Sequence, residues 1–291
     1  MPKTWFITGV SRGLGAEIAK AAMRAGDRIV AAGRKRSAIA EKLGPDSDSL
    51  LSVQLDVTDV VQVRTAVREA VHRFGGIEVL VNNAGYGHMG FFEEMTLKDV
   101  KEQFDTNLFG VFQVIWATLP LMRSARKGKI FNVSSIAGLV GAQMASLYCT
   151  SKFALEGFSE SLAKEVSPFG ISVTIVEPGP FRTEFLKSES LRFGGKPIAD
   201  YEDSRRQIRA SMEERNGRQP GDPQKLAEAM VGLANEAKPP LRFFAGALAV
   251  NVADQKLAIM RAEIDSWRQL SISTDGNYDD AKVEGALRQL T

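Results

Sequence analysis

Short apolar runs rich in β-forming residues alternate with longer helical stretches along most of this chain, and this alternation limits the possible folds more than any other feature. Seven runs predict strands, at residues 5–7, 28–32, 51–55, 79–81, 129–133, 172–176 and 241–244. Five stretches with helical spacing separate them, at residues 15–25, 59–74, 97–122, 147–166 and 223–234. Several runs are apolar throughout, as in strands covered on both faces. The pattern predicts an α/β fold with a doubly wound parallel sheet.

The predicted domain organisation is a single catalytic domain over residues 1–250, since no internal repeat or low-complexity linker divides the 291 residues. Residues from about 185 to 222 are polar and charged and interrupt the strand–helix rhythm. An insertion of this length in a compact domain is usually a lid or a mobile loop. Residues 251–291 are predicted to be a C-terminal helical extension packed on the same domain, helical to about Trp267 and polar beyond it.

Charge and composition exclude several classes of protein. The chain has 37 Lys+Arg against 35 Asp+Glu, which gives no electrostatic reason to expect nucleic acid or an anionic membrane as a partner. Cys149 is the single cysteine and there are two histidines, so neither an internal disulfide nor a zinc site is expected. No run of eighteen apolar residues predicts a membrane span, and no signal peptide is evident. We therefore expect a cytoplasmic protein.

A glycine-rich segment, Thr8-Gly9-Val10-Ser11-Arg12-Gly13-Leu14-Gly15, joins the first predicted strand to the first predicted helix. Glycines at these positions permit a tight turn and let backbone N–H groups approach a pyrophosphate at the positive end of the helix dipole. The alternative is an ordinary strand-to-helix turn. The position of the segment favours a dinucleotide site in a Rossmann-type sheet.

The end of the second predicted strand bears on which dinucleotide binds. Enzymes that use NAD usually place an acid about twenty residues after the glycines, where it holds the ribose 2′-hydroxyl. Here the sequence reads Gly33-Arg34-Lys35-Arg36, without an acid, and Arg12 lies within the glycine segment. Cations bind a 2′-phosphate, whereas a carboxylate repels it. Although a solvated basic loop is the alternative, we predict NADP(H) as the cofactor.

Tyr148 and Lys152 are four residues apart near the start of a predicted helix, which puts both side chains on one helix face. A nearby ammonium favours the phenolate form of tyrosine, so the pair could exchange a proton with a hydroxyl or carbonyl group. Alone, this spacing is equally compatible with an exposed helix face.

Polar residues at other predicted strand ends support a catalytic site. Ser134-Ser135 end one strand, thirteen residues before Tyr148 (148 − 135 = 13), and Asn82-Asn83-Ala84-Gly85 end another. Ligands of open α/β sheets bind at such strand ends. Asn107 lies in an otherwise apolar helical stretch, where its poor helix propensity requires a reason.

Together these motifs resemble the short-chain dehydrogenase/reductase family. The matching elements, in the family's order over about residues 4–185, are the glycine segment at 8–15, Asp56-Val57, Asn-Asn-Ala-Gly at 82–85, Asn107, Ser135, Tyr148-x3-Lys152 and Pro178-Gly179 followed by Thr183. The resemblance implies that Tyr148 is the general acid/base and that Lys152 lowers its pKa and binds the nicotinamide ribose. It also implies that Ser135 hydrogen-bonds the reacting oxygen and that Asn107 holds a water linking Lys152 to solvent.

The same resemblance implies a set of cofactor-binding residues. Asp56 and Val57 are expected to contact the adenine, Asn83 the adenosine ribose, and Phe181 and Thr183 the nicotinamide side. The full predicted set is Thr8, Gly9, Ser11, Arg12, Gly13, Leu14, Gly15, Gly33, Arg34, Asp56, Val57, Asn83, Ala84, Gly85, Tyr148, Lys152, Pro178, Gly179, Phe181 and Thr183. A homodimer or homotetramer is also expected.

The predicted function is NADP(H)-dependent interconversion of a carbonyl and a secondary alcohol. Residues predicted to contact substrate are Ser135, Tyr148, His88, Val140 and Met144, although solvation in a loop is the competing interpretation for His88. The small apolar residues among them favour a steroid-like, retinoid-like or acyl substrate. Two alternatives stay open: a non-redox enzyme of the same fold, such as an epimerase, or a catalytically silent NADP(H)-sensing protein.

Overall fold

The structure, a computed structural model, describes residues 2–187 and 190–276. The chain forms two compact units, Met1–Val250 and Asn251–Thr291. The packing of the second unit on the first stays a prediction.

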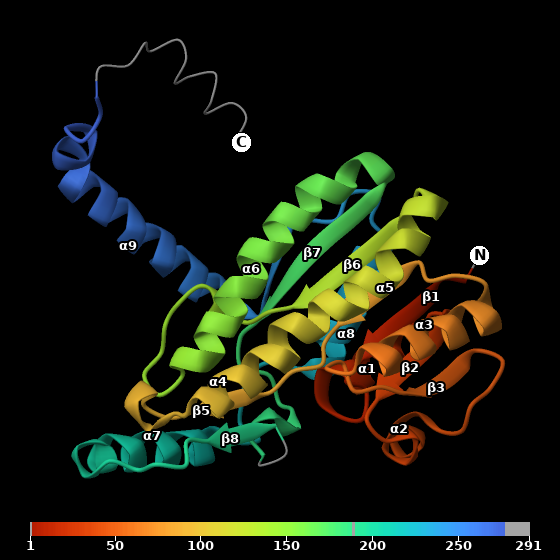
Figure 1. Cartoon of the computed structure of the whole chain (residues 1–291), viewed down its shortest axis with the longest axis horizontal. Helices are drawn as coiled ribbons and strands as arrows, with labels where there is room; N and C mark the ends of the chain where they lie inside the picture. The colour runs from red at the N-terminus through yellow and green to blue at the C-terminus, as the bar shows by residue number, and fades with distance from the viewer. Residues whose placement is uncertain (1, 188–189, 277–291) are drawn as a thin grey trace. The chain divides into compact units, whose positions relative to one another are not determined.

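A parallel sheet with the strand order β3-β2-β1-β4-β6-β7-β9 forms the centre of the first unit (Figure 1). Its strands are β1 (Thr4–Thr8), β2 (Arg28–Gly33), β3 (Leu50–Gln54), β4 (Val79–Asn82), β6 (Gly128–Val133), β7 (Ile171–Pro178) and β9 (Arg242–Ala245). The order reverses between β1 and β4, which is the switch point where α/β sheets bind their ligands. The seven predicted strands and the doubly wound parallel sheet are confirmed.

Helices cover both faces of this sheet. Those of the first unit are α1 (Gly13–Arg24), α2 (Arg36–Leu43), α3 (Val60–Phe74), α4 (Leu97–Phe104), α5 (Gly110–Ala125), α6 (Ser146–Val166), α7 (Glu202–Arg215) and α8 (Pro223–Asn235). A π-helical turn, Asp105–Phe109, joins α4 to α5 and so interrupts the single helix predicted there. Helices α2 and α7 were not predicted, because they bury few apolar side chains and so lack an apolar face.

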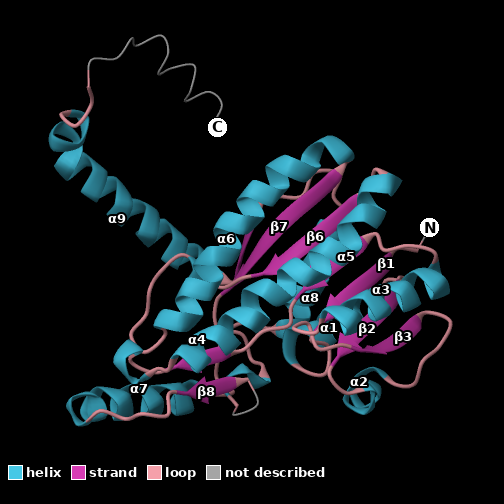
Figure 2. Cartoon of the chain, in the orientation of Figure 1, coloured by secondary structure: helices cyan, strands magenta, loops and turns pink. Residues whose placement is uncertain are grey.

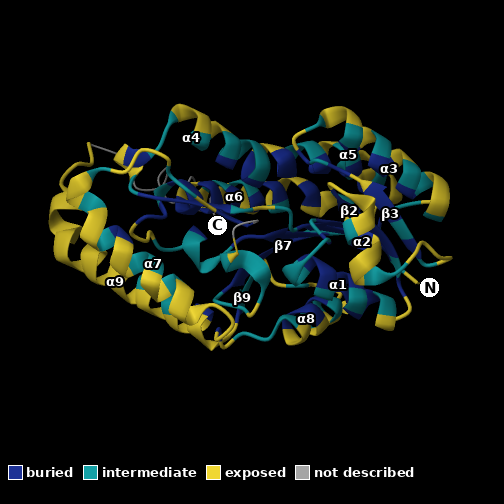
Figure 3. Ribbon diagram, turned by 90° about the horizontal axis from the view of Figure 1, so that it is seen from below, coloured by how far each residue is buried: buried dark blue, intermediate teal, exposed yellow. Residues whose placement is uncertain are grey.

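The pleat of β1 divides the core into two layers. Phe6 packs with the apolar faces of α3, α5 and α6, whereas Trp5 and Ile7 pack with those of α1 and α8. All three side chains are fully buried, and burying a side chain of this size stabilises a fold by about 1.5–3 kcal/mol. Figure 3 shows the strands as buried and the outer helix surfaces as exposed. The rigid sheet fixes where each strand ends, and therefore where the polar residues after β1, β4 and β6 lie.

The helical stretch Leu97–Ala125 is long and apolar enough to cross a membrane by length and composition alone. In the fold, α5 packs against α3 and against β4 and β6. This packing accounts for part of its apolar character, as in the core helices of soluble domains.

The polar segment predicted as a lid or mobile loop contains regular structure, which the sequence analysis did not predict. Strand β8 (Leu191–Phe193) pairs in parallel with β5 (Gly87–Met89), apart from the main sheet (Figure 2). Arg205 of α7 forms a buried ion pair with Glu94, while Tyr201 stacks on Phe91 with ring centroids 4.2 Å apart. The segment is therefore anchored to residues 87–94 by pairing, charge and aromatic contact.

Helix α9 spans Ala247–Ile272, five residues beyond the predicted end at Trp267 (272 − 267 = 5). The polar end was predicted to begin after Trp267, and its residues 277–291 lie outside the described residues.

Candidate active site

The turn between β1 and α1 depends on its glycines. Gly9 and Gly13 have φ angles of 73° and 57°, in the left-handed region that glycine adopts without strain. At Gly15 an added Cβ would lie 2.5 Å from the Gly9 carbonyl oxygen, too close for any other residue. The three glycines therefore let the turn form and let α1 begin directly above it.

Thr8 and Asn83 hold this turn against the end of β4. The Thr8 hydroxyl accepts hydrogen bonds from the backbone N–H groups of Asn83 and Ala84, both at 3.0 Å. In return, the Asn83 side chain donates to the carbonyl groups of Thr8 and Gly9, at 2.9 and 3.2 Å. Thr8 and Gly15 brace the turn and are not among the residues that line the cavity, and their predicted contact with cofactor stays a prediction.

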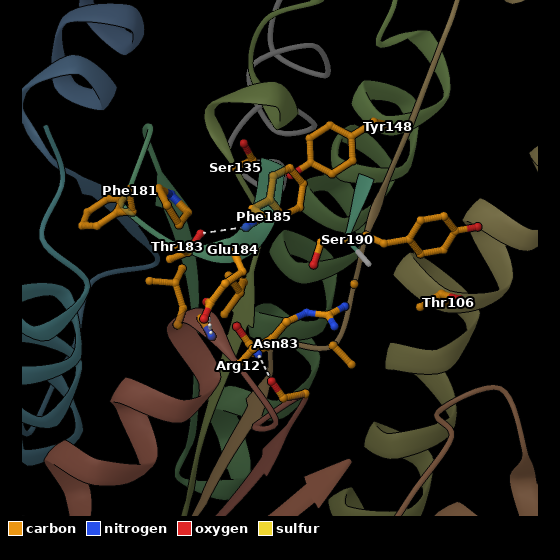
Figure 4. Close-up of a pocket in the computed structure, with 18 of the residues that line it drawn as sticks. Arg12, Asn83, Thr106, Ser135, Tyr148, Phe181, Thr183, Glu184, Phe185 and Ser190 are labelled. Atoms are coloured by element: carbon orange, nitrogen blue, oxygen red, sulfur yellow. Dashed lines mark hydrogen bonds between the residues drawn. The ribbon is translucent and has the colours of Figure 1, made fainter. Parts of the chain in front are cut away.

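A cavity of about 710 Å³ lies over this switch point (Figure 4). Most of the predicted cofactor residues line it, namely Gly9, Ser11, Arg12, Gly13, Leu14, Gly33, Arg34, Asp56, Val57, Asn83, Ala84, Gly85, Tyr148, Lys152, Pro178, Gly179, Phe181 and Thr183. Cavities of about 300–1,000 Å³ are typical of sites for small molecules and cofactors. The residues collected from separate strand ends thus form one binding cavity.

The Glu184 carboxylate already accepts a hydrogen bond from the glycine turn. The backbone N–H of Gly13 donates to Glu184 Oε2 at 3.2 Å, and Lys42 Nζ lies 3.8 Å from Oε1. A helix N-terminus of this kind binds anions. The carboxylate therefore stands where a phosphate would fit, which supports an anion site at Gly13. The sequence analysis missed Glu184, because its contact with Gly13 is not local in sequence.

The basic run after β2 divides between two environments. Arg34 lines the cavity together with Arg12 and Gly33. Arg36 instead begins α2 and forms an ion pair with Glu69 at 2.9 Å. The three basic residues of this run are therefore not equivalent. Arg36 belongs to a helix and points to Glu69, whereas Arg34 lines the cavity.

Ser135, Tyr148 and Lys152 meet on one wall of the cavity. Ser135 follows β6, and the other two lie in the first turns of α6. Lys152 Nζ lies 5.8 Å from the Tyr148 ring centroid and donates to the Val133 carbonyl at 2.7 Å. Figure 4 shows Ser135 and Tyr148 on the same side of the cavity. An acid/base group and a hydroxyl donor thus face the same space.

Burial controls the protonation of this group. Burial raises the pKa of Tyr148 to about 12, and the Ser135 hydroxyl acts in the opposite direction. Burial also lowers the pKa of Lys152 to about 8, although the negative charge of Glu156 acts to raise it. Desolvation thus sets the Tyr148 pKa in the protein without cofactor, and the predicted lowering of that pKa by Lys152 stays a prediction. Tyr148 is protonated at neutral pH, which is the form that can donate a proton.

Asn107 lies in the π-helical turn and does not line the cavity. Its side chain donates to the Tyr86 carbonyl at 2.9 Å and to Ser151 Oγ at 3.2 Å, and accepts from the Tyr86 N–H at 3.1 Å. These contacts explain a polar residue in an apolar stretch, since they fix the chain after β4. Its predicted water-holding role stays a prediction.

Three of the five predicted substrate contacts are not on the cavity wall: His88, Val140 and Met144. His88 is neither in the cavity nor solvated, because it lies in β5, is 3% exposed and has Nε2 3.6 Å from Asp99 Oδ1. Met144 is buried, with a φ angle of 61°. The corresponding wall is instead formed by Tyr86, Thr106, Phe185, Leu186, Ser190, Arg192, Arg215, Gln219 and Leu248. Six of them lie in the 185–222 segment that the sequence predicts as a lid, whereas no local motif marks Tyr86, Thr106 or Leu248.

The described residues contain no group of three His, Cys, Asp or Glu side chains arranged to hold a metal ion.

Comparison with known proteins gives one consistent family. The profile of the family described as short chain dehydrogenase matches residues 3–192. The chain is 37% identical over 276 residues to oxidoreductase BOA17 of Botryotinia fuckeliana, covering 94% of this chain and 100% of that protein. It is 39% identical over 268 residues to 3-ketodihydrosphingosine reductase of Bacteroides thetaiotaomicron, covering 91% and 93%.

Solved structures give the same result. A short-chain dehydrogenase from Streptomyces avermitilis superposes with a TM-score of 0.85 at 36% identity, over 95% of this chain and 99% of that one. ElxO with NADP bound superposes with a TM-score of 0.68 at 28% sequence identity, over 82% of this chain and 94% of that one. A 3-ketoacyl-(acyl-carrier-protein) reductase from Brucella melitensis complexed with NADH superposes with a TM-score of 0.67 at 25% sequence identity, over 80% of this chain and 90% of that one. Relatives with this fold thus bind either nicotinamide dinucleotide.

Proposed function

This chain belongs to the short-chain dehydrogenase/reductase family, and from that premise we propose that it is an NADP(H)-dependent oxidoreductase that interconverts a carbonyl and a secondary alcohol on a mainly apolar substrate. The observation that carries the proposal is the convergence of Ser135, Tyr148 and Lys152 on the wall of the cavity that also contains the glycine turn. A silent sensor would not need this set beside a dinucleotide site.

In the proposed mechanism, the Ser135 hydroxyl donates a hydrogen bond to the substrate carbonyl and holds it beside Tyr148. Tyr148 then protonates the oxygen as negative charge develops on it, which is general acid catalysis. The buried Lys152 ammonium stabilises the phenolate that remains and orients the cofactor ribose. Bound NADP(H) supplies or accepts the hydride. In the oxidative direction the same residues act in reverse, with Tyr148 as the base.

The preference for NADP(H) over NAD(H) is supported by charge. Arg34 and Arg12 lie on the cavity wall, and the end of β2 has Gly33 where an NAD enzyme would carry an acid. Because relatives bind either dinucleotide, family membership does not decide the preference. The 2′-phosphate is expected beside Arg34.

An apolar substrate is supported by the surroundings of the Tyr148 ring. The ring packs among Met89, Leu191 and Phe185, with the Phe185 centroid 5.7 Å away. One relative is a 3-ketodihydrosphingosine reductase, whose name describes a ketone on a long-chain substrate. We therefore propose long-chain or polycyclic ketones as substrates. The reaction is proposed to take place in the cytoplasm.

A homodimer or homotetramer is supported by apolar side chains that the described structure leaves exposed on α5, α6 and the turn before α5. Phe109, Trp116 and Phe153 are 47%, 71% and 44% exposed. Exposed aromatic side chains grouped on one surface commonly mark a protein–protein contact.

The test is a screen of ketones with the purified protein, following the consumption of NADPH and of NADH. The panel contains long-chain 3-keto compounds, steroid ketones and retinaldehyde. We expect turnover of at least one apolar ketone and a higher kcat/KM with NADPH. Tight binding of NADPH without turnover of any ketone or oxidation of any alcohol would instead support the sensing protein.

A further inference from the structure

Charged side chains from three elements meet in the interior behind Lys152. Glu156 lies on α6, four residues after Lys152, Glu177 lies near the end of β7, and Arg242 lies on β9. Glu156 is 5% exposed and Glu177 is fully buried. The Arg242 guanidinium joins them, with Nη2 3.4 Å from Glu156 Oε2 and Nε 3.4 Å from Glu177 Oε1. Arg242 also pairs with Glu160 at 2.6 Å, on the outer side of the group.

Stability does not account for this arrangement. A buried ion pair often contributes less to stability than apolar side chains of the same size, because both ions lose their hydration. Two buried carboxylates that face one guanidinium contribute even less to stability, because the two negative charges repel each other. Such a group requires a role, and its nearest functional neighbour is the lysine one helical turn away.

Two observations relate the group to the cavity wall. Glu156 and Lys152 share a helix face through their i, i+4 spacing, and the charge of Glu156 acts to raise the pKa of the buried Lys152. Gly138, just after Ser135, leaves room for the carboxylate: a Cβ there would lie 3.0 Å from Glu156 Oε1 and 2.8 Å from Ser134 Oγ. The carboxylate therefore lies beside Gly138, three residues after Ser135 in the same turn.

We propose that Glu156 is a positioning residue for Lys152: its carboxylate, held by Arg242, keeps the Lys152 amine protonated inside the protein. The carboxyl groups of Glu156 and Glu177 together retain one proton, and Glu177 carries it. The inference rests on the proposed function, in which the charged form of Lys152 stabilises the Tyr148 phenolate. It adds a residue that touches neither substrate nor cofactor and acts through the lysine alone.

The groups that face Glu156 make it the site of the negative charge. Lys152 and Glu160 approach from α6, Arg242 from β9, Glu177 from β7 and the Ser134 hydroxyl from the end of β6. Burial raises the pKa of both carboxyls, that of Glu177 to about 8 with repulsion from Glu156 adding to the shift. Glu156 has two cations and a hydroxyl beside it, so the shared proton resides on Glu177.

A direct test is the titration of the Lys152 amine by NMR, using protein labelled with ¹³C at the lysine ε-carbons and Lys152→Met to assign the signal. Glu156→Gln is expected to lower the Lys152 midpoint by about one pH unit, the smaller end of the range for a close opposite charge. Glu160→Gln removes another carboxylate from the same Arg242 and is the matched control, with no shift expected. Glu177→Gln is expected to leave the midpoint unchanged or higher, because Glu156 then ionises more readily.

The pH profile of kcat/KM gives a second readout. Loss of the Lys152 proton ends activity on the alkaline side, so Glu156→Gln should move that limb to lower pH by about one unit. Glu156→Asp keeps the charge and should restore most of the wild-type profile, which a purely structural role would not predict.

Thermal unfolding separates the role of Glu177 from activity altogether. When folding raises the pKa of a carboxyl group, the protein loses stability as the pH rises from the unfolded-state pKa to the folded-state pKa. The wild type should therefore lose stability relative to Glu177→Gln between about pH 4.5 and pH 8. The difference between their free energies of unfolding should be complete above pH 8.

An unchanged Lys152 midpoint in Glu156→Gln, or an equal shift in Glu160→Gln, would overturn the inference. If the protein reduces no ketone, the rate measurement fails together with the proposed function, whereas the NMR titration still decides the inference.

Discussion

The two ends of the cavity are built in different ways. At the cofactor end, backbone N–H groups and strand ends of the main sheet form the wall, and close packing fixes them. At the substrate end, the wall comes from the turn after β4 and from residues 185–187 and 190–219, which are tied down by the short β5–β8 pair and by side-chain contacts. The first wall is part of the core, whereas the second is attached to it.

This difference has consequences for energy and motion. A wall formed by the ends of core strands opens only when the domain unfolds, whereas a segment with few buried apolar contacts opens locally at a smaller free-energy cost. The cofactor end should therefore be rigid with or without ligand. The substrate end should open and close around a substrate, and its opening should depend on a few anchoring side chains. Four predictions test this comparison.

The largest expected effect is on catalysis, at the boundary between the two ends. Tyr148→Phe removes only the transferable proton and should lower kcat by roughly 10²–10⁴-fold. The dissociation constant for NADPH should be nearly unchanged, because the ring stays in place. Steady-state kinetics and a binding titration measure the two quantities. Tyr201→Phe, the same change in a tyrosine that stacks on Phe91 outside the cavity, is the control and should keep the wild-type kcat. Retention of most of the rate in Tyr148→Phe would remove Tyr148 from its proposed role.

The second effect concerns the anchors of the substrate end. Arg205→Met leaves Glu94, which is 2% exposed, without its guanidinium. Removal of one partner of a buried ion pair costs about 3–5 kcal/mol. Hydrogen exchange over residues 190–215 should become faster, and KM for the ketone should rise, while NADPH binding stays unchanged.

Arg206→Met is the matched control for this experiment, since Arg206 pairs with the exposed Asp203 and should change little. In the wild type, substrate and cofactor together should slow exchange over residues 185–222. Full protection of this segment in the ligand-free protein would show that it is a fixed wall. Equal protection of both ends of the cavity would break the comparison itself.

The same difference explains what could be predicted from the sequence. At the cofactor end, the glycine turn and the residues after β1, β4 and β6 were predictable, because each follows from a local turn or a strand end that the sheet then brings together. Glu184 and Arg36 show the limit: the contact of the first with Gly13 and the pairing of the second with Glu69 join residues far apart in the sequence. No local pattern carries that information.

At the substrate end, His88, Val140 and Met144 were predicted contacts, yet the structure places others there. Strands β5 and β8 have three residues each, too few to show a period of two, and they pair across about a hundred residues of chain. His88 is buried by that pairing. Its position depends on a strand pair that no sequence pattern predicts.

The third prediction sharpens the cofactor end. A hydrogen bond to a charged group contributes about 1.5–3 kcal/mol, so Arg34→Ala should lower the NADPH to NADH ratio of kcat/KM by about tenfold or more, less what salt screens. Gly33→Asp should lower it further, because a carboxylate repels the phosphate. A Cβ at Gly33 meets Ile39 at 3.4 Å, so the change requires a small shift at most. Arg36→Ala, which removes the partner of Glu69, should leave the ratio unchanged. Equal kcat/KM values for the two cofactors in the wild type would show that Arg34 is only a solvated residue.

The smallest effect concerns Glu184, where the two ends of the cavity meet. Its carboxylate accepts from the Gly13 N–H and lies 34% exposed beside Lys42, so a phosphate must displace it. Glu184→Gln keeps the shape and removes the charge. An exposed or partly exposed charge interaction is worth about 0.2–1 kcal/mol, so the dissociation constant for NADPH should fall by a factor of about 1.4 to 5, and less at high salt. Glu17→Gln, a change in an α1 residue outside the cavity, is the control. Weaker binding in Glu184→Gln would mean that the carboxylate helps to hold the cofactor, and the attached segment would then contribute to the rigid end as well.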